Sequence, residues 1–322
     1  MEWKDRPVVV TGASGFIGSH IVERLSGLGA HVKAIVHGDP QFRSGYLAGK
    51  PLANLSIAGG DVRDLDFIRR NVEGADTVIH LGAVTSVQYS FAHPSETIEV
   101  NTMGTNNVCI AARGAGVRRV LHASTGGSYG NAKDGKPIAE DHHMVASSPY
   151  VAGKIAADYT VQTHFLSYGL PVATVRLFNA YGPRVGRFLI IPTVIQQFLK
   201  GPHIKLGDLT PTRPFLYIDD IVDAFLAMGE AEGVEGDVIH FGGPESVSMG
   251  ELVQRIAALI GVTPEIEQDP TRMRPKNSEI HRQSVDGSKA ERVLGWKAKV
   301  GLDEGLRRTI DWVRAGGYEK QL

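Results

Sequence analysis

Short runs of Val, Ile and Leu alternate with longer segments of helical periodicity through the first 180 residues. The short runs are almost continuously apolar, as is typical of parallel strands covered by helices on both faces. They predict strands at 7–12, 31–36, 55–62, 76–82, 118–124 and 171–179. The segments between them predict helices near 16–28, 65–73, 95–115 and 149–168. This alternation predicts a doubly wound α/β domain.

After residue 180 the rhythm changes, because glycine and proline divide the chain into shorter segments. Ser248 and Glu251 have the spacing of a capping box at the start of a helix, and a final helix is expected near 302–315. We therefore expect a first domain over 1–180 and a smaller lobe over 181–322, with 215–243 returning to the first domain.

Composition and charge exclude several classes of partner. The 322 residues carry a formal net charge of −1, so nothing in the charge balance favours a nucleic acid or an anionic membrane. The apolar run after the charged N-terminus is too short for a secretory segment or a membrane span, and we expect a cytoplasmic location. Cys109 is the single cysteine, which excludes an internal disulfide and a multi-cysteine zinc site; we expect it to be a buried apolar side chain, and we expect no metal.

Three glycines follow the first predicted strand in the stretch "VVVTGASGFIGSH", which places Gly12, Gly15 and Gly18 just before a helix. Glycines permit a tight turn and close approach of the backbone, and a helix N-terminus offers unpaired N–H groups to an anion. The position after the first strand of a βαβ unit favours a dinucleotide pyrophosphate site.

Together with this turn, an ordered series of motifs resembles the extended short-chain dehydrogenase/reductase family, the NAD-dependent sugar-nucleotide epimerases and dehydratases. These motifs are "TGASGFIG", "GDVRD", "HLGA", "NTMGT", Tyr150 with Lys154, "RLFNAYGP", "RPFLYIDD" and "DGSKAERVLGW", and they span nearly the whole chain. The resemblance implies a Rossmann-type domain that binds NAD(P), a C-terminal lobe that binds a nucleotide-diphosphate sugar, and a homodimer formed through the helices near 95–115 and 149–168.

Position by position, the resemblance implies two sets of binding residues. The expected cofactor set is Gly12, Gly15, Phe16, Ile17, Gly18, His37, Asp61, Val62, Leu81, Gly82, Ala83, Asn101, Tyr150, Lys154 and Phe178. The expected substrate set is Thr85, Ser86, Thr125, Asn179, Lys205, Arg213 and Arg274. Val36 and His37 stand where a Rossmann strand often carries an acid for the ribose hydroxyls, and Arg43 could meet a 2′-phosphate. We favour NAD, because such enzymes often recycle the cofactor within one turnover, and NADP stays open.

Tyr150 and Lys154 are four residues apart just inside a predicted helix, so they share one face of it. An ammonium there is expected to lower the tyrosine pKa toward neutrality, so that the phenolate can accept a hydroxyl proton. In the family a Ser or Thr shares the substrate hydroxyl with this tyrosine, and Thr125 stands at that position. The expected catalytic residues are Thr125, Tyr150 and Lys154.

The residues after Thr125 bear on the reaction. The 4,6-dehydratase branch of the family carries a carboxylate there, whereas this chain has Gly126 and Gly127. Glycine cannot transfer a proton, so the pattern favours a UDP-hexose type 4-epimerase that works through a transient 4-keto sugar. The segments "LGDLTPTRPFLYIDD" and "RMRPKNSEIHRQSVDGSKAERVLGW" are instead most similar to 4,6-dehydratases of GlcNAc-type sugars.

Several alternatives to the epimerase stay open. They are the 4,6-dehydratase, a 4-ketoreductase or decarboxylase, and a cofactor-binding protein without turnover. Glu140 and Asp141 precede Tyr150 in a polar loop, where we expect them to be solvated rather than to act as replacement bases.

Overall fold

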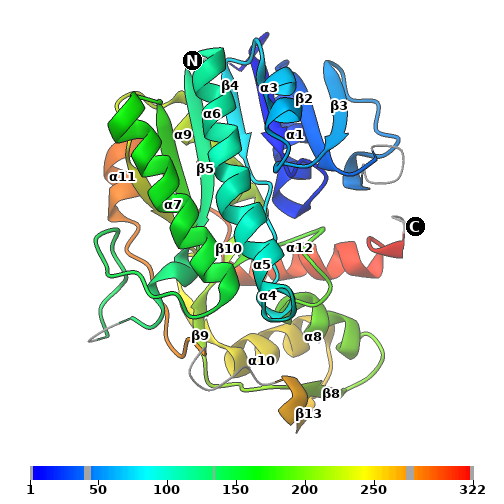
Figure 1. Cartoon of the computed structure of the whole chain (residues 1–322). Helices are drawn as coiled ribbons and strands as arrows, with labels where there is room; N and C mark the ends of the chain where they lie inside the picture. The colour runs from blue at the N-terminus through cyan, green and yellow to red at the C-terminus, as the bar shows by residue number, and fades with distance from the viewer. Residues whose placement is uncertain (1–2, 40–44, 133–134, 273–278, 320–322) are drawn as a thin grey trace.

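A seven-stranded sheet of parallel strands forms the centre of the computed structural model (Figure 1). The structure describes residues 3–39, 45–132, 135–272 and 279–319. The strands of the sheet are β1 (Pro7–Thr11), β2 (His31–His37), β3 (Leu55–Gly60), β4 (Thr77–His80), β5 (Arg119–Thr125), β6 (Val172–Leu177) and β11 (Val238–Phe241). Their spatial order is β3-β2-β1-β4-β5-β6-β11. The chain therefore turns outward in opposite directions on the two sides of the β1–β4 pair, which is where doubly wound folds bind ligands.

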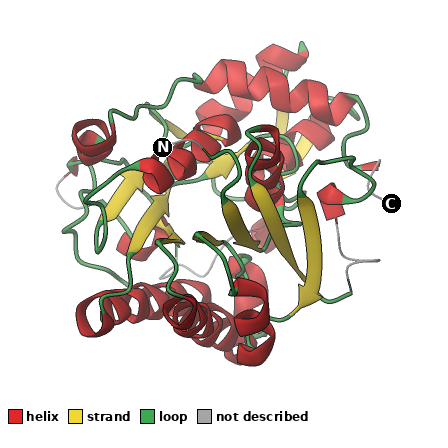
Figure 2. Cartoon of the chain, turned by 90° about the horizontal axis from the view of Figure 1, so that it is seen from above, coloured by secondary structure: helices red, strands yellow, loops and turns green. Residues whose placement is uncertain are grey.

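Helices cover both faces of the sheet (Figure 2). One face packs against α3 (Leu65–Val72), α6 (Gly104–Ala115) and α7 (Pro149–Tyr168). The other face packs against α1 (Phe16–Gly27) and α9 (Ile218–Glu230), which also contact each other. Burial on both faces explains why most residues of the strands are Val, Ile, Leu or Ala.

The second half of the chain adds a smaller layer at the carboxyl ends of the strands (Figure 1). Its helices are α8 (Ile190–Phe198), α10 (Met249–Ile260) and α12 (Leu302–Arg314), whereas α11 (Ser288–Leu294) packs beside β11 at the edge of the large sheet. Its short strand pairs are β7 (Ala180–Tyr181) with β10 (Leu216–Tyr217), β9 (Thr212–Pro214) with β12 (Ser246–Ser248), and β8 (His203–Leu206) with β13 (Glu265–Gln268). Buried residues of α8, α10 and α12 join the same hydrophobic cluster as those of α1 and α9. The two halves therefore share a continuous core.

Most elements lie where the sequence predicts them, and the doubly wound fold class is confirmed. The helix expected near 95–115 is broken into α5 (Pro94–Ile98), a π-helical segment η2 (Glu99–Met103) and α6. π-Helical turns inside α-helices often mark functional sites. Ser248 caps α10 by accepting a hydrogen bond from the Glu251 N–H at 3.0 Å, which is the first half of the expected capping box.

Cys109 lies in α6 and is buried, as expected. Burial raises the pKa of its thiol to about 12, because the thiolate would lose its hydration there. This side chain therefore packs as a small apolar group.

Candidate functional site

The glycine turn between β1 and α1 is shaped by close backbone contacts. Gly12 has φ of +66°, and a Cβ there would lie 2.9 Å from the Gly82 nitrogen of the neighbouring β4 loop. A Cβ on Gly18 would overlap the Gly12 carbonyl oxygen. Gly15 is the N-cap of α1 and supplies no side chain, so the first N–H groups of Phe16 and Ile17 stay available at the helix N-terminus. This space and these donors fit a dinucleotide pyrophosphate.

The loop after β4 is held by a directed chain of hydrogen bonds. The Thr11 hydroxyl accepts from the Leu81 and Gly82 N–H groups and lies 2.8 Å from His80 Nδ1. His80 Nε2 lies 3.0 Å from the Thr105 hydroxyl, which itself donates to the Asn101 carbonyl. The Thr105 oxygen must then accept from Nε2–H, so His80 is the Nε2–H tautomer. Burial lowers its pKa well below the usual value and keeps it neutral.

Asn101 is buried in η2, and both polar atoms of its side chain hold the backbone of Val84. The structure thus gives this predicted cofactor residue a supporting part, in which it fixes the loop that carries Leu81, Gly82 and Ala83. Ser86 is similarly occupied, because its hydroxyl caps α4 (Val87–Ala92) by accepting from the Tyr89 N–H at 3.1 Å. Thr85, beside it, is exposed.

The end of β2 meets the loop after β3. His37 is exposed, and its Nε2 lies 3.4 Å from a carboxylate oxygen of Asp61. Asp61 also pairs with Arg63 at 2.7 Å. A carboxylate therefore stands beside β2 although β2 itself ends in histidine. Val62 is partly buried against Gly104 of α6.

Tyr150, Lys154 and Thr125 come together at the carboxyl end of β5. Tyr150 and Lys154 lie one turn apart in the first part of α7, which Ser148 caps. The Thr125 hydroxyl hydrogen-bonds the Tyr150 phenol and accepts a hydrogen bond from the Gly127 N–H at 3.1 Å. Lys154 is 6% exposed and donates from Nζ to the Ala123 carbonyl at 2.6 Å.

The tyrosine pKa differs from the sequence-based expectation. Burial raises the pKa of Tyr150, because the phenolate loses hydration, and the hydrogen bond from Thr125 only partly opposes this. In the protein without ligands, Lys154 does not lower the tyrosine pKa, since its ammonium donates a hydrogen bond to the Ala123 carbonyl of β5. The expectation of a near-neutral tyrosine was wrong for the chain by itself.

Behind Lys154 lies a buried carboxylate, Asp158, one further turn along α7. It accepts hydrogen bonds from His122 Nε2 at 3.1 Å, the Ser124 hydroxyl at 2.8 Å and the Arg176 guanidinium at 2.6 Å. Burial alone would raise the pKa of Asp158, but the hydrogen bond from His122 and the Arg176 charge outweigh it and lower the pKa to about 2. Asp158 is therefore a buried anion with three donors.

The same network continues toward β11. Arg176 also donates to the Tyr129 hydroxyl, which lies 2.8 Å from His240 Nε2. Register pairs Ser124 with Arg176 and Arg176 with His240 across three neighbouring strands. Burial lowers the pKa of His240 to about 3, so it is neutral.

Glu140 belongs to this network and is not a solvated loop residue. Its carboxylate accepts from the His240 N–H at 3.0 Å, and its carbonyl accepts from the Tyr129 hydroxyl at 3.2 Å. The expectation of a solvated side chain was wrong for Glu140, because strand β11 returns beside this loop. The Glu140 carboxylate already accepts a hydrogen bond from the β11 backbone, which argues against its acting as a replacement base.

The turn after Thr125 is η3 (Gly126–Tyr129), and its two glycines lie in different surroundings. A Cβ on Gly126 would overlap the Phe178 ring, whose Cγ would be 2.6 Å away. A Cβ on Gly127 would meet the Thr125 hydroxyl at 3.3 Å and Val151 at 3.8 Å, which a small shift accommodates. Phe178 is 1% exposed and packs beneath the turn against Tyr129 and His240.

The other predicted substrate residues follow β6 in the chain. Asn179 follows β6 with φ of +37°, a strained conformation for a residue other than glycine. Arg213 is 9% exposed and forms an ion pair with Glu279 at 3.0 Å, and Lys205 is exposed on β8 and pairs with Glu267 at 3.0 Å. Arg274 and Arg43 lie outside the described residues.

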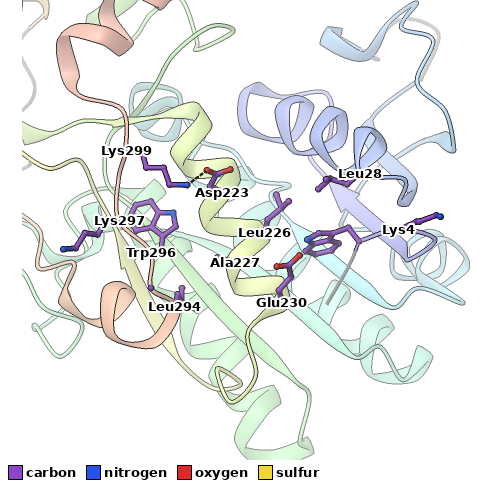
Figure 3. A pocket seen from close by; sticks show the side chains of 12 residues that line it. Lys4, Leu28, Asp223, Leu226, Ala227, Glu230, Leu294, Trp296, Lys297 and Lys299 are labelled. Carbon is purple, nitrogen blue, oxygen red and sulfur yellow. Dashed lines mark hydrogen bonds and ion pairs between the residues drawn. The ribbon is translucent and has the colours of Figure 1, made fainter.

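A cavity of about 680 Å³ opens on the α9 side of the sheet, opposite α7 (Figure 3). Trp296, Leu226 and Glu230 line it, and its Asp223 pairs with Lys299 at 3.3 Å. None of the predicted site residues that the structure describes lines this cavity. Within the described ranges, no group of three or more His, Cys, Asp or Glu side chains could hold a metal ion, and none of the helices found there could cross a membrane.

Sequence reasoning missed the polar residues beneath the site. They are His80, His122, Ser124, Asp158, Arg176, Tyr129 and His240. Two signals were available. Asp158 repeats the four-residue spacing from Tyr150 to Lys154, and His80, His122 and His240 interrupt otherwise apolar strands.

Known proteins of similar sequence and structure identify the family of this chain. The family model described as GDP-mannose 4,6 dehydratase matches residues 9–309. A UDP-glucose 4-epimerase from Mycolicibacterium smegmatis is 33% identical over 311 residues, which cover 95% of this chain and 98% of the relative. A dTDP-glucose 4,6-dehydratase from Streptomyces venezuelae, solved with NAD bound, has a TM-score of 0.85 and 30% identity, covering 96% of this chain and 97% of that one.

A UDP-N-acetylglucosamine 4-epimerase from Methanobrevibacter ruminantium, solved with UDP-N-acetylmuramic acid, has a TM-score of 0.87 and 28% identity and covers 97% of this chain and 99% of that one. Both reaction types thus occur among the relatives at similar identity. The chain belongs to the family that the GDP-mannose 4,6-dehydratase model describes, the NAD-dependent sugar-nucleotide epimerases and dehydratases of the extended short-chain dehydrogenase/reductase type.

Proposed function

We propose that this chain is an NAD-dependent nucleotide-sugar 4-epimerase of the UDP-hexose type. The observation that carries the proposal is the pair Gly126 and Gly127 directly after Thr125, with the Phe178 ring filling the space beneath Gly126. Oxidation of a sugar at C4 and return of the hydride to the other face need one acid–base group at the C4 hydroxyl. The turn offers no carboxylate for a further elimination step.

The cofactor would lie across the carboxyl ends of β1 and β4. Gly12, Gly15 and Gly18 leave space for its pyrophosphate, and the N–H groups of Phe16 and Ile17 at the start of α1 would donate to it. Bound NAD⁺ supplies the hydride acceptor. Asp61 beside His37 offers a carboxylate to the adenosine ribose, which favours NAD over NADP.

Tyr150 is the proposed general base toward the sugar C4 hydroxyl. Thr125 shares a hydrogen bond with that phenol and can orient the substrate hydroxyl against it. Lys154 supplies positive charge one helical turn away and has N–H donors beyond the one that Ala123 accepts. Phe178 supports the turn from below rather than lining the open site.

The nucleotide-diphosphate sugar would bind between the turn and the second layer. Thr85, Ser86 and Asn179 are the proposed contacts for the sugar, and Lys205, Arg213 and Arg274 are the proposed contacts for the nucleotide and its phosphates. Arg213 is paired with Glu279, so a phosphate would have to share or displace that carboxylate.

A 4,6-dehydratase is the second candidate, because the matching family model carries that description and a relative of that reaction has a TM-score of 0.85. Elimination of water across C5 and C6 needs a base at C5 and an acid at the leaving hydroxyl. Glu140 is tied to the backbone of His240, so its carboxylate is already occupied.

We also propose a homodimer. Apolar side chains are exposed along α5, η2 and α7, including Ile98, Met103, Tyr159 and Leu166, the last at 71% exposed. α5 and α7 lie side by side (Figure 1), so these side chains can form one face. A cytoplasmic location stays part of the proposal.

The test is incubation of the purified chain with UDP-glucose, UDP-N-acetylglucosamine or UDP-glucuronic acid in D₂O, followed by proton NMR. The proposal expects interconversion of C4 epimers without net absorbance change at 340 nm. A 4-keto-6-deoxy product with deuterium at C5 would establish the dehydratase instead, and a stoichiometric absorbance change would indicate a reductase.

A further inference from the structure

Helix α7 carries three ionisable side chains at four-residue intervals: Tyr150, Lys154 and Asp158. Residues at this spacing follow one another along one face of a helix. The first two belong to the proposed reaction, and the third lies one turn deeper, 7% exposed. We propose that Asp158 is a positioning residue that keeps the Lys154 ammonium charged and aligned beneath Tyr150. This inference deepens the proposed function and rests on it.

Asp158 is fixed from three directions. His122 and Ser124 on β5 and Arg176 on β6 each donate to its carboxylate, at 3.1, 2.8 and 2.6 Å. These bonds tie α7 to two strands, and those from β5 come from the residues on either side of Ala123, whose carbonyl accepts from Lys154. The same carboxylate therefore sets both the position of the helix and the charge behind Lys154.

The ammonium of Lys154 needs that charge. It is buried, and within the described part of the chain its one hydrogen bond goes to a neutral carbonyl. Desolvation lowers the pKa of Lys154 to about 8; the Asp158 carboxylate raises it and the Arg176 guanidinium lowers it. Arginine cannot lose its proton, so the lysine is the cation that gives way when the balance changes.

The other ionisable groups around Asp158 are held uncharged. On β5 and β4, burial lowers the pKa of His122 to about 4 and that of His80 well below its usual value. On β11, burial lowers the pKa of His240 to about 3, and in η3 burial raises the pKa of Tyr129.

Glu140, beyond His240, is directed to the β11 backbone. The charges that act on Lys154 are therefore the Arg176 guanidinium and the Asp158 carboxylate, the latter being the anion. Without Asp158, two buried positive charges would lie together uncompensated.

The alternative is that Asp158 only fastens α7 to the sheet. Asp220 provides a matched control, because it is 2% exposed on α9 and accepts hydrogen bonds from the Lys299 and Val300 N–H groups on the other face. Loss of its charge should affect stability without reaching Lys154.

The experiment is an NMR titration of Lys154 in the full chain labelled with ¹³C,¹⁵N-lysine, as purified and saturated with NAD⁺, with K154M assigning the signal. D158N should lower the lysine titration midpoint by about one pH unit or more. R176Q should raise it, and D220N should leave it unchanged. An unchanged midpoint in D158N, or equal shifts in D158N and D220N, would overturn the proposal.

If D158N does not fold, R176Q provides the test, because removal of the Arg176 charge should raise the lysine titration midpoint. An unchanged or lowered midpoint in R176Q would contradict the proposal. A double-mutant cycle on kcat adds a second readout: once Lys154 is methionine, D158N should cost little more. A chain that does not epimerise any UDP-sugar would refute the proposed function, whereas the lysine titration would still judge the part played by Asp158.

Discussion

The Phe178 ring lies directly beneath Gly126, so that a Cβ at position 126 would overlap ring carbons. A Cβ at position 127 would lie 3.3 Å from the Thr125 hydroxyl, a contact that a small shift relieves. Phe178 cannot easily move aside, because it is buried against Tyr129, Ile138 and His240. The two adjacent glycines are therefore unequal, because position 126 has no space for a Cβ and position 127 accommodates one after a small shift.

This difference predicts the stability of two matched variants. Gly126→Ala should lower the free energy of unfolding by about 1–3 kcal/mol through overpacking against Phe178. Gly127→Ala should change it by less than about 1 kcal/mol, because its neighbours need only shift slightly. Urea unfolding of both proteins measures the difference. Equal destabilisation of the two variants would mean that the Phe178 ring does not limit position 126.

Removal of the Tyr150 hydroxyl should abolish most turnover. Tyr150→Phe leaves the ring that fills the space beside Thr125 but takes away the proton acceptor, so kcat should fall about 10²- to 10⁴-fold. NAD⁺ affinity, measured by calorimetry, should change little. Undiminished epimerisation in this variant would show that another group takes the proton.

The raised tyrosine pKa has a consequence for the pH profile. The phenol is protonated at neutral pH, so the rate should rise with pH as the phenolate forms. The Thr125 hydrogen bond lowers that pKa, so Thr125→Val should move the ascending limb to higher pH. Thr160→Val, which removes a hydroxyl bonded to the Ala156 carbonyl elsewhere on α7, is the control and should leave the limb in place.

Buried neutral histidines should make the fold sensitive to mild acid. The pKa values of His122 and His240 are lowered to about 4 and about 3, against 6.5 when unfolded, so below pH 6.5 the unfolded chain binds more protons. Stability should be complete above pH 6.5 and fall toward pH 4 by about 1.4 kcal/mol per pH unit for each histidine. His240→Gln should reduce this slope in urea unfolding between pH 4.5 and 7. A stability curve that stays flat down to pH 4.5 would contradict the neutral assignment.

The exposed apolar face of α5, η2 and α7 predicts an effect on assembly. Leu166→Glu should convert a dimer to a monomer in light scattering, because it places a charge in the face that we propose is buried. Leu28→Glu, at an exposed leucine next to the α9 cavity, should not. A wild-type chain that is monomeric at micromolar concentration would contradict the proposed homodimer.

The sheet and most helices could be predicted from sequence, because parallel strands buried on both faces are rich in Val, Ile and Leu. Thr125, Tyr150 and Lys154 could also be identified, since spacing within one helix and position after one strand determine where they lie. Interactions between distant strands could not. Ser124, Arg176 and His240 are neighbours only because β5, β6 and β11 pair in register.

Charge and burial were the other limits. The spacing of Tyr150 and Lys154 indicates that they are close but not that burial raises the tyrosine pKa. Nor could the sequence separate Gly126 from Gly127, because the ring that closes one of them comes from Phe178, some fifty residues later, directly after the neighbouring strand β6.

The most direct test of the whole account follows the hydrogen on C5 of a UDP-hexose in D₂O by proton NMR, with the wild-type chain and NAD⁺. We predict that the C4 epimer accumulates to an equilibrium ratio while the C5 hydrogen is retained as protium. Washout of that hydrogen together with appearance of a C6 methyl signal would contradict it.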